Sequence, residues 1–313
     1  MREMLAKPFG LVLSGLYGLT DSYLLSIIIL TLVVRLLLLP ASISQQKNSA
    51  KQVRLNSKVN KIRQKYAGNQ QKIQEETQAL YQREGFGAAN MGCMPLMVQM
   101  IVMIGLYEVM YTPLTNVINL ASSKITALQN IMGVTVDAKG ANTRQVQLQI
   151  LSKVTEFKDK LVGVEGITSE DVDALTHLKE SFMLGSLDLT AIPDKSNPSL
   201  LWLIPIVAFL TAMLSSVFMY MKQRKQNPEM AKNPSMGCMT FMSPVMSLVF
   251  TFMFPAGVGF YWIVSNVFSF VQQVVLTYVY SPKKVIAQQM VDETVVRRSK
   301  ENNIKRQAEI EKK

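Results

Sequence analysis

The most unusual chemical group in this sequence is an arginine inside an apolar run. Arg35 is the one charged side chain between Tyr23 and Pro40. A charge at the centre of a lipid bilayer costs roughly 2.5 to 17 kcal/mol, so such an arginine either reaches the head groups or faces water inside the protein. Because Pro40 ends the run shortly afterwards, the run by itself leaves both placements open.

Polar side chains recur in other apolar runs, at what we expect to be a similar depth. Spans that contribute polar groups at one depth are expected to converge on one wet cavity, which Arg35 would line. These polar residues are Gln99 in one run, Thr211, Ser215 and Ser216 in another, and Asn266, Gln272 and Gln273 in a third.

The residue combinations needed for catalysis are missing. An intramembrane protease needs a Ser/His pair, two aspartates or a zinc site, and the apolar runs contain neither His nor Asp. The sole histidine, His177, lies outside them, and Cys93 and Cys238 do not have metal-ligand spacing. No phosphate-binding or dinucleotide-binding glycine motif is present. We therefore predict a protein that is not an enzyme and binds no cofactor or metal.

Composition indicates what positions these groups. The 313 residues are 49% hydrophobic and 18% charged, against roughly 25% charged in ordinary soluble domains. The apolar residues gather in five runs of about 17 to 22 residues, each long enough to cross a hydrocarbon layer of about 30 Å. The predicted fold class is an all-α integral membrane protein with five transmembrane helices, at 22–40, 91–112, 199–221, 236–254 and 257–279.

The distribution of basic residues predicts an orientation. The formal net charge is +11, with nine Lys or Arg in 41–90, four in 222–235 and nine in 281–313. Residues 112–199 carry eight basic and ten acidic side chains, a net charge of 8 − 10 = −2. The positive-inside rule therefore places the N-terminus outside and the C-terminus in the cytoplasm.

The segments between the spans have their own patterns. Residues 1–21 are typical of an interfacial helix, and Leu55, Val59, Ile62 and Tyr66 predict the first arm of a basic helical hairpin at 41–90. The external insertion 113–198 is expected to be α-helical, with one helix from Val146 to Leu161 and another capped at Thr168 and running to about Leu184. The cytoplasmic loop 222–235 is short, and the pattern leaves the basic tail 280–313 open between a helix and a disordered segment.

Exposed basic residues of the hairpin and the tail suggest partners. They could contact anionic lipid, ribosomal RNA or a partner protein, although a simply solvated hairpin fits the same pattern. The candidates are Lys58, Lys61, Arg63, Lys65, Lys283, Lys284, Arg297 and Arg298.

Three stretches of the sequence carry a family resemblance. The first is Thr31–Pro40 with its arginine, and the second runs from Gly92-Cys93-Met94-Pro95 through Gln99 to Leu106-Tyr107. The third is Phe254-Pro255-Ala256-Gly257 with Tyr261-Trp262, Ser265-Asn266 and Gln272-Gln273. Together they resemble the YidC/Oxa/Alb family of membrane protein insertases, in its Gram-positive form.

The resemblance implies five helices around a hydrophilic groove that is open to the cytoplasm and to lipid but closed to the outside. It implies a monomer of the bacterial cell membrane that inserts and helps to fold nascent membrane proteins without ATP hydrolysis, alone or with the Sec translocon, and with ribosome contacts. Arg35 matches the groove arginine and Trp262 a tryptophan of the fifth span. With them, the expected groove residues are Gln99, Thr211, Ser215, Asn266, Gln272 and Gln273.

The sequence departs from the family in two places. Ser215-Ser216 stand where many relatives have glutamines, and the insertion 120–196 is longer than the external loop of many Gram-positive members. Two other classes remain open on the sequence alone: a small transporter or channel that uses Arg35 as an anion site, and a scaffold whose basic segments recruit ribosomes.

Overall fold

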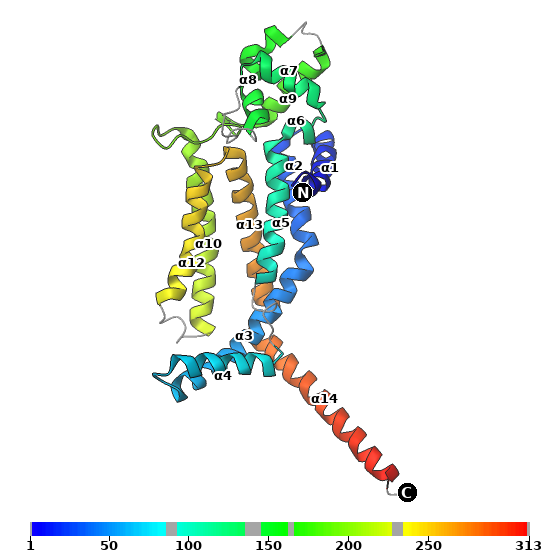
Figure 1. Cartoon of the computed structure of the whole chain (residues 1–313), viewed down its shortest axis with the longest axis vertical. Coiled ribbons are helices and arrows are strands. Elements are labelled where there is room, and N and C mark those ends of the chain that lie inside the picture. The colour runs from blue at the N-terminus through cyan, green and yellow to red at the C-terminus, as the bar shows by residue number, and fades with distance from the viewer. Residues whose placement is uncertain (1, 86–92, 135–144, 162–165, 227–233, 312–313) are drawn as a thin grey trace. The chain divides into compact units, whose positions relative to one another are not determined.

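A computed structural model of the chain describes residues 2–85, 93–134, 145–161, 166–226 and 234–311 (Figure 1). Within these ranges, the side chains of residues 2–5, 93–99, 226, 234–239 and 306–311 are not described. The chain forms two compact units. The first contains residues 1–37 and 97–270, and the second contains residues 38–96 and 271–313.

The structure is almost entirely helical, as the sequence predicts for an all-α membrane protein. Helices of the first unit are α1 (Arg2–Thr20), α2 (Tyr23–Leu37), α5 (Cys93–Tyr111), α6 (Pro113–Asn116), α7 (Ser122–Ile131), α8 (Val146–Leu161), α9 (Ser169–Ser181), η3 (Leu200–Trp202), α10 (Leu203–Gln226), α12 (Pro234–Thr251) and α13 (Ala256–Val279), of which α5 and α13 extend into the second unit. A hairpin of β1 (Met183–Leu184) and β2 (Leu187–Asp188) is also present. The second unit holds α3 (Leu39–Lys65), α4 (Gln70–Arg83) and α14 (Pro282–Glu311).

Helices α10 and α13 are the clearest candidates for membrane spans. Within the described residues, 200–225 and 256–279 are long and apolar enough to cross a membrane, and α2 with α3 makes a third candidate if the two count as one broken span. Residues 100–111 of α5 and 240–251 of α12 are shorter apolar helices. Helix α10 exposes an apolar stripe suited to lipid: Leu203, Ile206, Leu210, Leu214, Val217 and Met221. Helices α10 and α12 pack against each other (Figure 1).

The break after the first apolar run differs from the expectation. Helix α2 ends at Leu37, and Pro40 lies in the first turn of α3 instead of ending a span. Proline is tolerated there because the first turn of a helix has no intrahelical acceptor for its missing N–H. The first arm of the hairpin therefore begins at Leu39 and runs to Lys65.

The insertion 113–198 contains α6, α7, α8 and α9 with the β-hairpin. Thr168 and Asp171 form the reciprocal capping box at the start of α9. The helix ends at Ser181, not at about Leu184 as predicted, and Met183–Leu184 instead form a strand. Gly185 follows with φ of +62°, a conformation that suits the two-residue turn of the hairpin and that glycine adopts without steric cost.

In the second unit, α3 and α4 form a helical hairpin, and α14 packs against α3. Asn69 caps α4 by accepting a hydrogen bond from the backbone of Lys72. Arg54 of α3 binds both carboxylate oxygens of Glu293 of α14, at 2.8 and 3.1 Å. The hydrogen bond from Arg54 and, secondarily, nearby positive charges hold the pKa of the exposed Glu293 carboxyl below its usual value. The tail, which the pattern left open between helix and disorder, is a helix up to Glu311.

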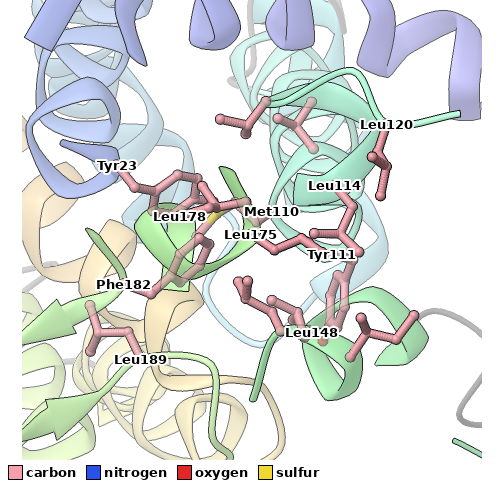
Figure 2. Packing of buried hydrophobic residues seen from close by; sticks show 14 of the residues in the cluster. Tyr23, Met110, Tyr111, Leu114, Leu120, Leu148, Leu175, Leu178, Phe182 and Leu189 are labelled. Atoms are coloured by element: carbon pink, nitrogen blue, oxygen red, sulfur yellow. The ribbon is translucent and has the colours of Figure 1, made fainter. Parts of the chain in front are cut away.

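The hydrophobic core lies where the insertion meets the ends of α2 and α5. Leu175 and Leu178 of α9 and Phe182 pack with Tyr23, and Met110 and Tyr111 lie in the same cluster (Figure 2). The insertion is therefore part of the first unit and not a separate domain.

Candidate functional site

Arg35 lies on the face that α2 turns toward the protein. The buried residues of α2 are Tyr23, Ser26, Ile27, Leu30 and Thr31, and the next positions of that helical stripe are 34 and 35. Leu36 and Leu37, by contrast, are 58% and 74% exposed. The helical period therefore directs Arg35 inward, even though its neighbours in sequence face outward.

The guanidinium of Arg35 contacts α13. Its Nη2 donates to the hydroxyl of Ser265 at 2.7 Å and to the carbonyl of Ser265 at 3.2 Å. Arg35 is half-buried, and among the described residues no acidic side chain forms an ion pair with it. A guanidinium has five N–H donors, so this arrangement leaves a partly desolvated positive charge with donors to spare.

The next residue of α13 contacts a different helix. The side-chain amide of Asn266 donates to the carbonyl of Ala208 and to the hydroxyl of Thr211 of α10, both at 3.3 Å. Successive residues of an α-helix point about 100° apart. Ser265 and Asn266 therefore link α13 to α2 and to α10 at one level, so Arg35 and Thr211 contact successive residues of the same helix. A groove lined by these residues stays a prediction.

Ser215 lies one turn further along α10 than Thr211. Residues four apart share a helix face, so Ser215 continues the face that Thr211 presents to α13. Its hydroxyl oxygen is buried and has no hydrogen-bond partner among the described residues. A buried hydroxyl without a partner costs free energy, so a hydrogen bond from this hydroxyl to a ligand would be favourable.

Trp262 occupies different surroundings from the polar residues. Its ring packs in an aromatic cluster with Tyr107 of α5 and with Phe250 and Phe254, at centroid distances of 6.1, 6.1 and 6.3 Å. Trp262 lies one helical turn from Asn266, so the aromatic cluster adjoins the polar layer.

The described contacts do not test the other three predicted groove residues. The side chain of Gln99 lies outside the described residues. Gln272 and Gln273 are half-buried on the part of α13 that belongs to the second unit.

Sequence reasoning missed Ser265 as a site residue. It appears in the Ser265-Asn266 pair of the third motif, but only Asn266 was selected there. The one signal that could have found it is the spacing within this pair, since adjacent polar residues on a spanning helix must face two different neighbours.

The eight basic candidates of the hairpin and the tail are all exposed. Two of them pair within their own unit: Lys58 with Glu84, and Arg297 with Glu301 at 3.6 Å. The Lys65 amine lies 5.1 Å from the centre of the Tyr66 ring. Lys61, Arg63, Lys283, Lys284 and Arg298 are also exposed, and their use as a contact surface stays a prediction.

Comparison with known proteins identifies the family. Residues 15–284 match the family model described as "60Kd inner membrane protein". The chain belongs to this family. The resemblance to YidC-type insertases that three motifs indicate is thereby confirmed.

Relatives in this family carry insertase names. The chain is 26% identical over 275 residues to "Membrane protein insertase YidC 1" of Listeria monocytogenes, covering 87% of this chain and 69% of the relative. It is 27% identical over 256 residues to "Membrane protein insertase MisCA" of Bacillus subtilis, covering 80% of this chain and 69% of the relative. A relative from Janthinobacterium, "Membrane protein insertase YidC", is 28% identical over 270 residues, covering 86% of this chain and 36% of the relative.

Proposed function

We propose that this chain is a membrane protein insertase and that Arg35 is its substrate-attracting group. Family membership and the names of its relatives support the activity. The surroundings of Arg35 support its role. Its guanidinium is half-buried, donates hydrogen bonds to Ser265, and has no carboxylate partner among the described residues.

The mechanism follows from charge and solvation. Arg35, Asn266, Thr211 and Ser215 would line a hydrophilic groove that opens to the cytoplasm and to lipid and is closed to the outside. Arg35 would attract acidic or polar residues of a client segment that must cross, and the polar surroundings would shorten the apolar distance that they travel. The apolar segment of the client would then leave sideways into lipid, driven by burial at about 25 cal/mol per Å².

The exposed basic residues fit a cytoplasmic role in this proposal. With the N-terminus outside and the C-terminus in the cytoplasm, α3, α4 and α14 would face the inner leaflet and the ribosome. The partners would be nascent clients, anionic lipid, the ribosome and, for some clients, the Sec translocon. The chain would act as a monomer in the bacterial cell membrane, with no cofactor and no catalytic residue.

Substitution of Arg35 tests the proposal. In cells depleted of their own insertase, Arg35→Glu and Arg35→Ala are expected to lower insertion of a client with an acidic translocated segment by about tenfold or more, since a hydrogen bond to a charged group contributes about 1.5 to 3 kcal/mol. Arg35→Lys keeps the charge and should retain part of the activity.

A second client serves as the control. A matched client without acidic residues in the translocated segment should depend less on Arg35. Full insertion of the acidic client by both Arg35→Ala and Arg35→Glu would show that the groove charge is not used.

A further inference from the structure

A charged network joins α9 to β2 and to Thr190, and its residues are not among those of the proposed groove. Lys179 is 8% exposed and is the one charged residue among the buried residues of the described chain. Its amine donates to the carboxylate of Asp188 at 2.5 Å and to the hydroxyl of Thr190 at 3.1 Å. The other oxygen of Asp188 accepts from the backbone N–H and the hydroxyl of Thr190, at 3.0 and 2.6 Å. These four bonds fix the course of the backbone from Asp188 to Thr190.

That fixed backbone holds the first turn of α13. The N–H groups of Gly257 and Ala256 donate to the carbonyls of Leu189 and Ala191, both at 2.8 Å. The first N–H groups of a helix have no acceptor within the helix, so here the insertion supplies the acceptors. A Cβ atom at Gly257 would lie 3.2 Å from the Leu189 oxygen, so a glycine permits the close approach.

The same segment also holds the first turn of α2. The rings of Tyr23 and Phe182 stack with their centroids 3.8 Å apart and their planes 19° apart. Tyr23 is 0% exposed and Phe182 is 2% exposed. The backbone N–H of Leu189 donates to the carbonyl of Phe182 at 3.2 Å, and Figure 2 shows Leu189 close to the stacked rings.

We propose that the segment from Lys179 to Ala191 is a clamp that fixes the start of α13 against the start of α2 and keeps water from that end of the helices. Ser265 lies 265 − 256 = 9 residues after Ala256, about 14 Å along one continuous helix. A helix anchored at its first turn therefore keeps Ser265 and Asn266 level with Arg35. Lys179 and Asp188 are positioning residues in this role. That the clamp lies on the outer side of the membrane depends on the proposed orientation. The contacts of the clamp do not depend on that orientation.

Cysteine labelling tests the clamp. In full-length chain with Cys93→Ser and Cys238→Ser, Val258→Cys provides a reporter, because Val258 is 1% exposed at the start of α13. A membrane-impermeant maleimide is applied to intact cells and, separately, to inverted vesicles. Lys179→Met is expected to raise the labelling rate by about tenfold or more, because it leaves Asp188 without its ion-pair partner.

Lys124→Met is the matched control for charge loss. It removes the ion pair of Lys124 with Asp171, at 2.6 Å on the same insertion, and should change the labelling of Val258→Cys by less than about twofold. Ser186→Cys, at an exposed position, reports the orientation. Labelling of Ser186→Cys in inverted vesicles only would contradict the proposed orientation. The labelling rate of Val258→Cys in inverted vesicles would then test the clamp.

A second buried reporter separates local opening from unfolding. Leu128 is 1% exposed in α7, so Leu128→Cys should stay unlabelled in Lys179→Met if only the clamp opens. If both reporters are labelled, Gly257→Ala decides, because it crowds the Leu189 oxygen and leaves the ion pair intact. Faster labelling of Val258→Cys in Gly257→Ala supports the clamp. An unchanged rate there, or in Lys179→Met, overturns it.

A functional readout separates positioning from bulk stability. If the clamp sets the level of Ser265 against Arg35, Lys179→Met should lower insertion of an acidic client more than insertion of a client without acidic residues, and Lys179→Arg should recover part of the loss. Equal losses for both clients would assign Lys179 a stabilising role alone. If Arg35 itself is unused, the two clients will not differ in any variant, while the labelling result will still test the clamp.

Discussion

The insertion and the two candidate spanning helices, α10 and α13, bury their side chains to very different extents. In the insertion, Ile150, Leu151, Leu175 and Leu178 are all 0% exposed. In the apolar windows of α10 and α13, 17% of the residues are buried inside the protein. The insertion has the dense apolar core of a soluble protein, whereas α10 and α13 leave most of their apolar side chains outside the protein interior.

The difference follows from the solvent on each side. In water, burial of apolar surface drives packing. In lipid, an apolar side chain gains little by leaving the bilayer for another helix, so close packing and interhelical hydrogen bonds join the helices. The polar contacts made by Ser265 and Asn266 are of this second kind.

The largest expected effect is at the centre of the insertion core. Phe182→Ala should lower the free energy of unfolding by about 3 to 5 kcal/mol, because it leaves a cavity beside Tyr23. Thermal unfolding of the purified chain in detergent measures this effect. Leu184→Ala, at a residue that is 40% exposed, is the control and should cost far less. Equal losses would mean that the insertion core is not the stable part.

An intermediate effect is expected from pH on the insertion. Burial opposes ionisation of Asp188, but hydrogen bonds from Lys179 and Thr190 outweigh it and hold the pKa of this carboxyl below its usual value. A lowered folded-state pKa stabilises the fold above the unfolded-state value of about 3.9, and this contribution is lost as the pH falls through the folded-state value. The native chain should therefore lose stability below about pH 4.

Asp188→Asn isolates this contribution. Thermal unfolding measured from neutral pH down to the acidic range should show a smaller acid-induced loss in Asp188→Asn than in the native chain. Asp171, whose pKa is also lowered by Lys124 and Thr168 against the effect of burial, leaves a residual acid dependence. An unchanged pH profile in Asp188→Asn would remove Asp188 as a source of stability.

The smallest effect is expected in the membrane layer. A double-mutant cycle of Asn266→Ala and Thr211→Val should give a coupling energy of about 0.6 kcal/mol, typical of interhelical hydrogen bonds in membranes. Unfolding in detergent measures the cycle. A coupling energy as large as the loss of unfolding free energy in Phe182→Ala would show that the two regions do not differ in this way.

Much of the local structure could be predicted from the sequence. Apolar runs long enough to cross lipid and the capping box at Thr168 depend on residues close together in the chain. The end of α9 was predicted wrongly, because Gly185 redirects the chain into a hairpin that continued helical periodicity did not reveal. Motifs in three stretches were also enough to indicate the family.

The tertiary structure decided which of these elements meet. Arg35 contacts Ser265, which lies 230 residues later in the sequence, and Arg54 contacts Glu293, which lies 239 residues later. The carbonyls that cap α13 come from the segment that follows β2. Periodicity shows which face of a helix is apolar or polar, but it does not show which other helix that face will meet. The sequence by itself thus determined helices, apolar runs and a charge inside one of these runs, and only packing decided what holds that charge in place.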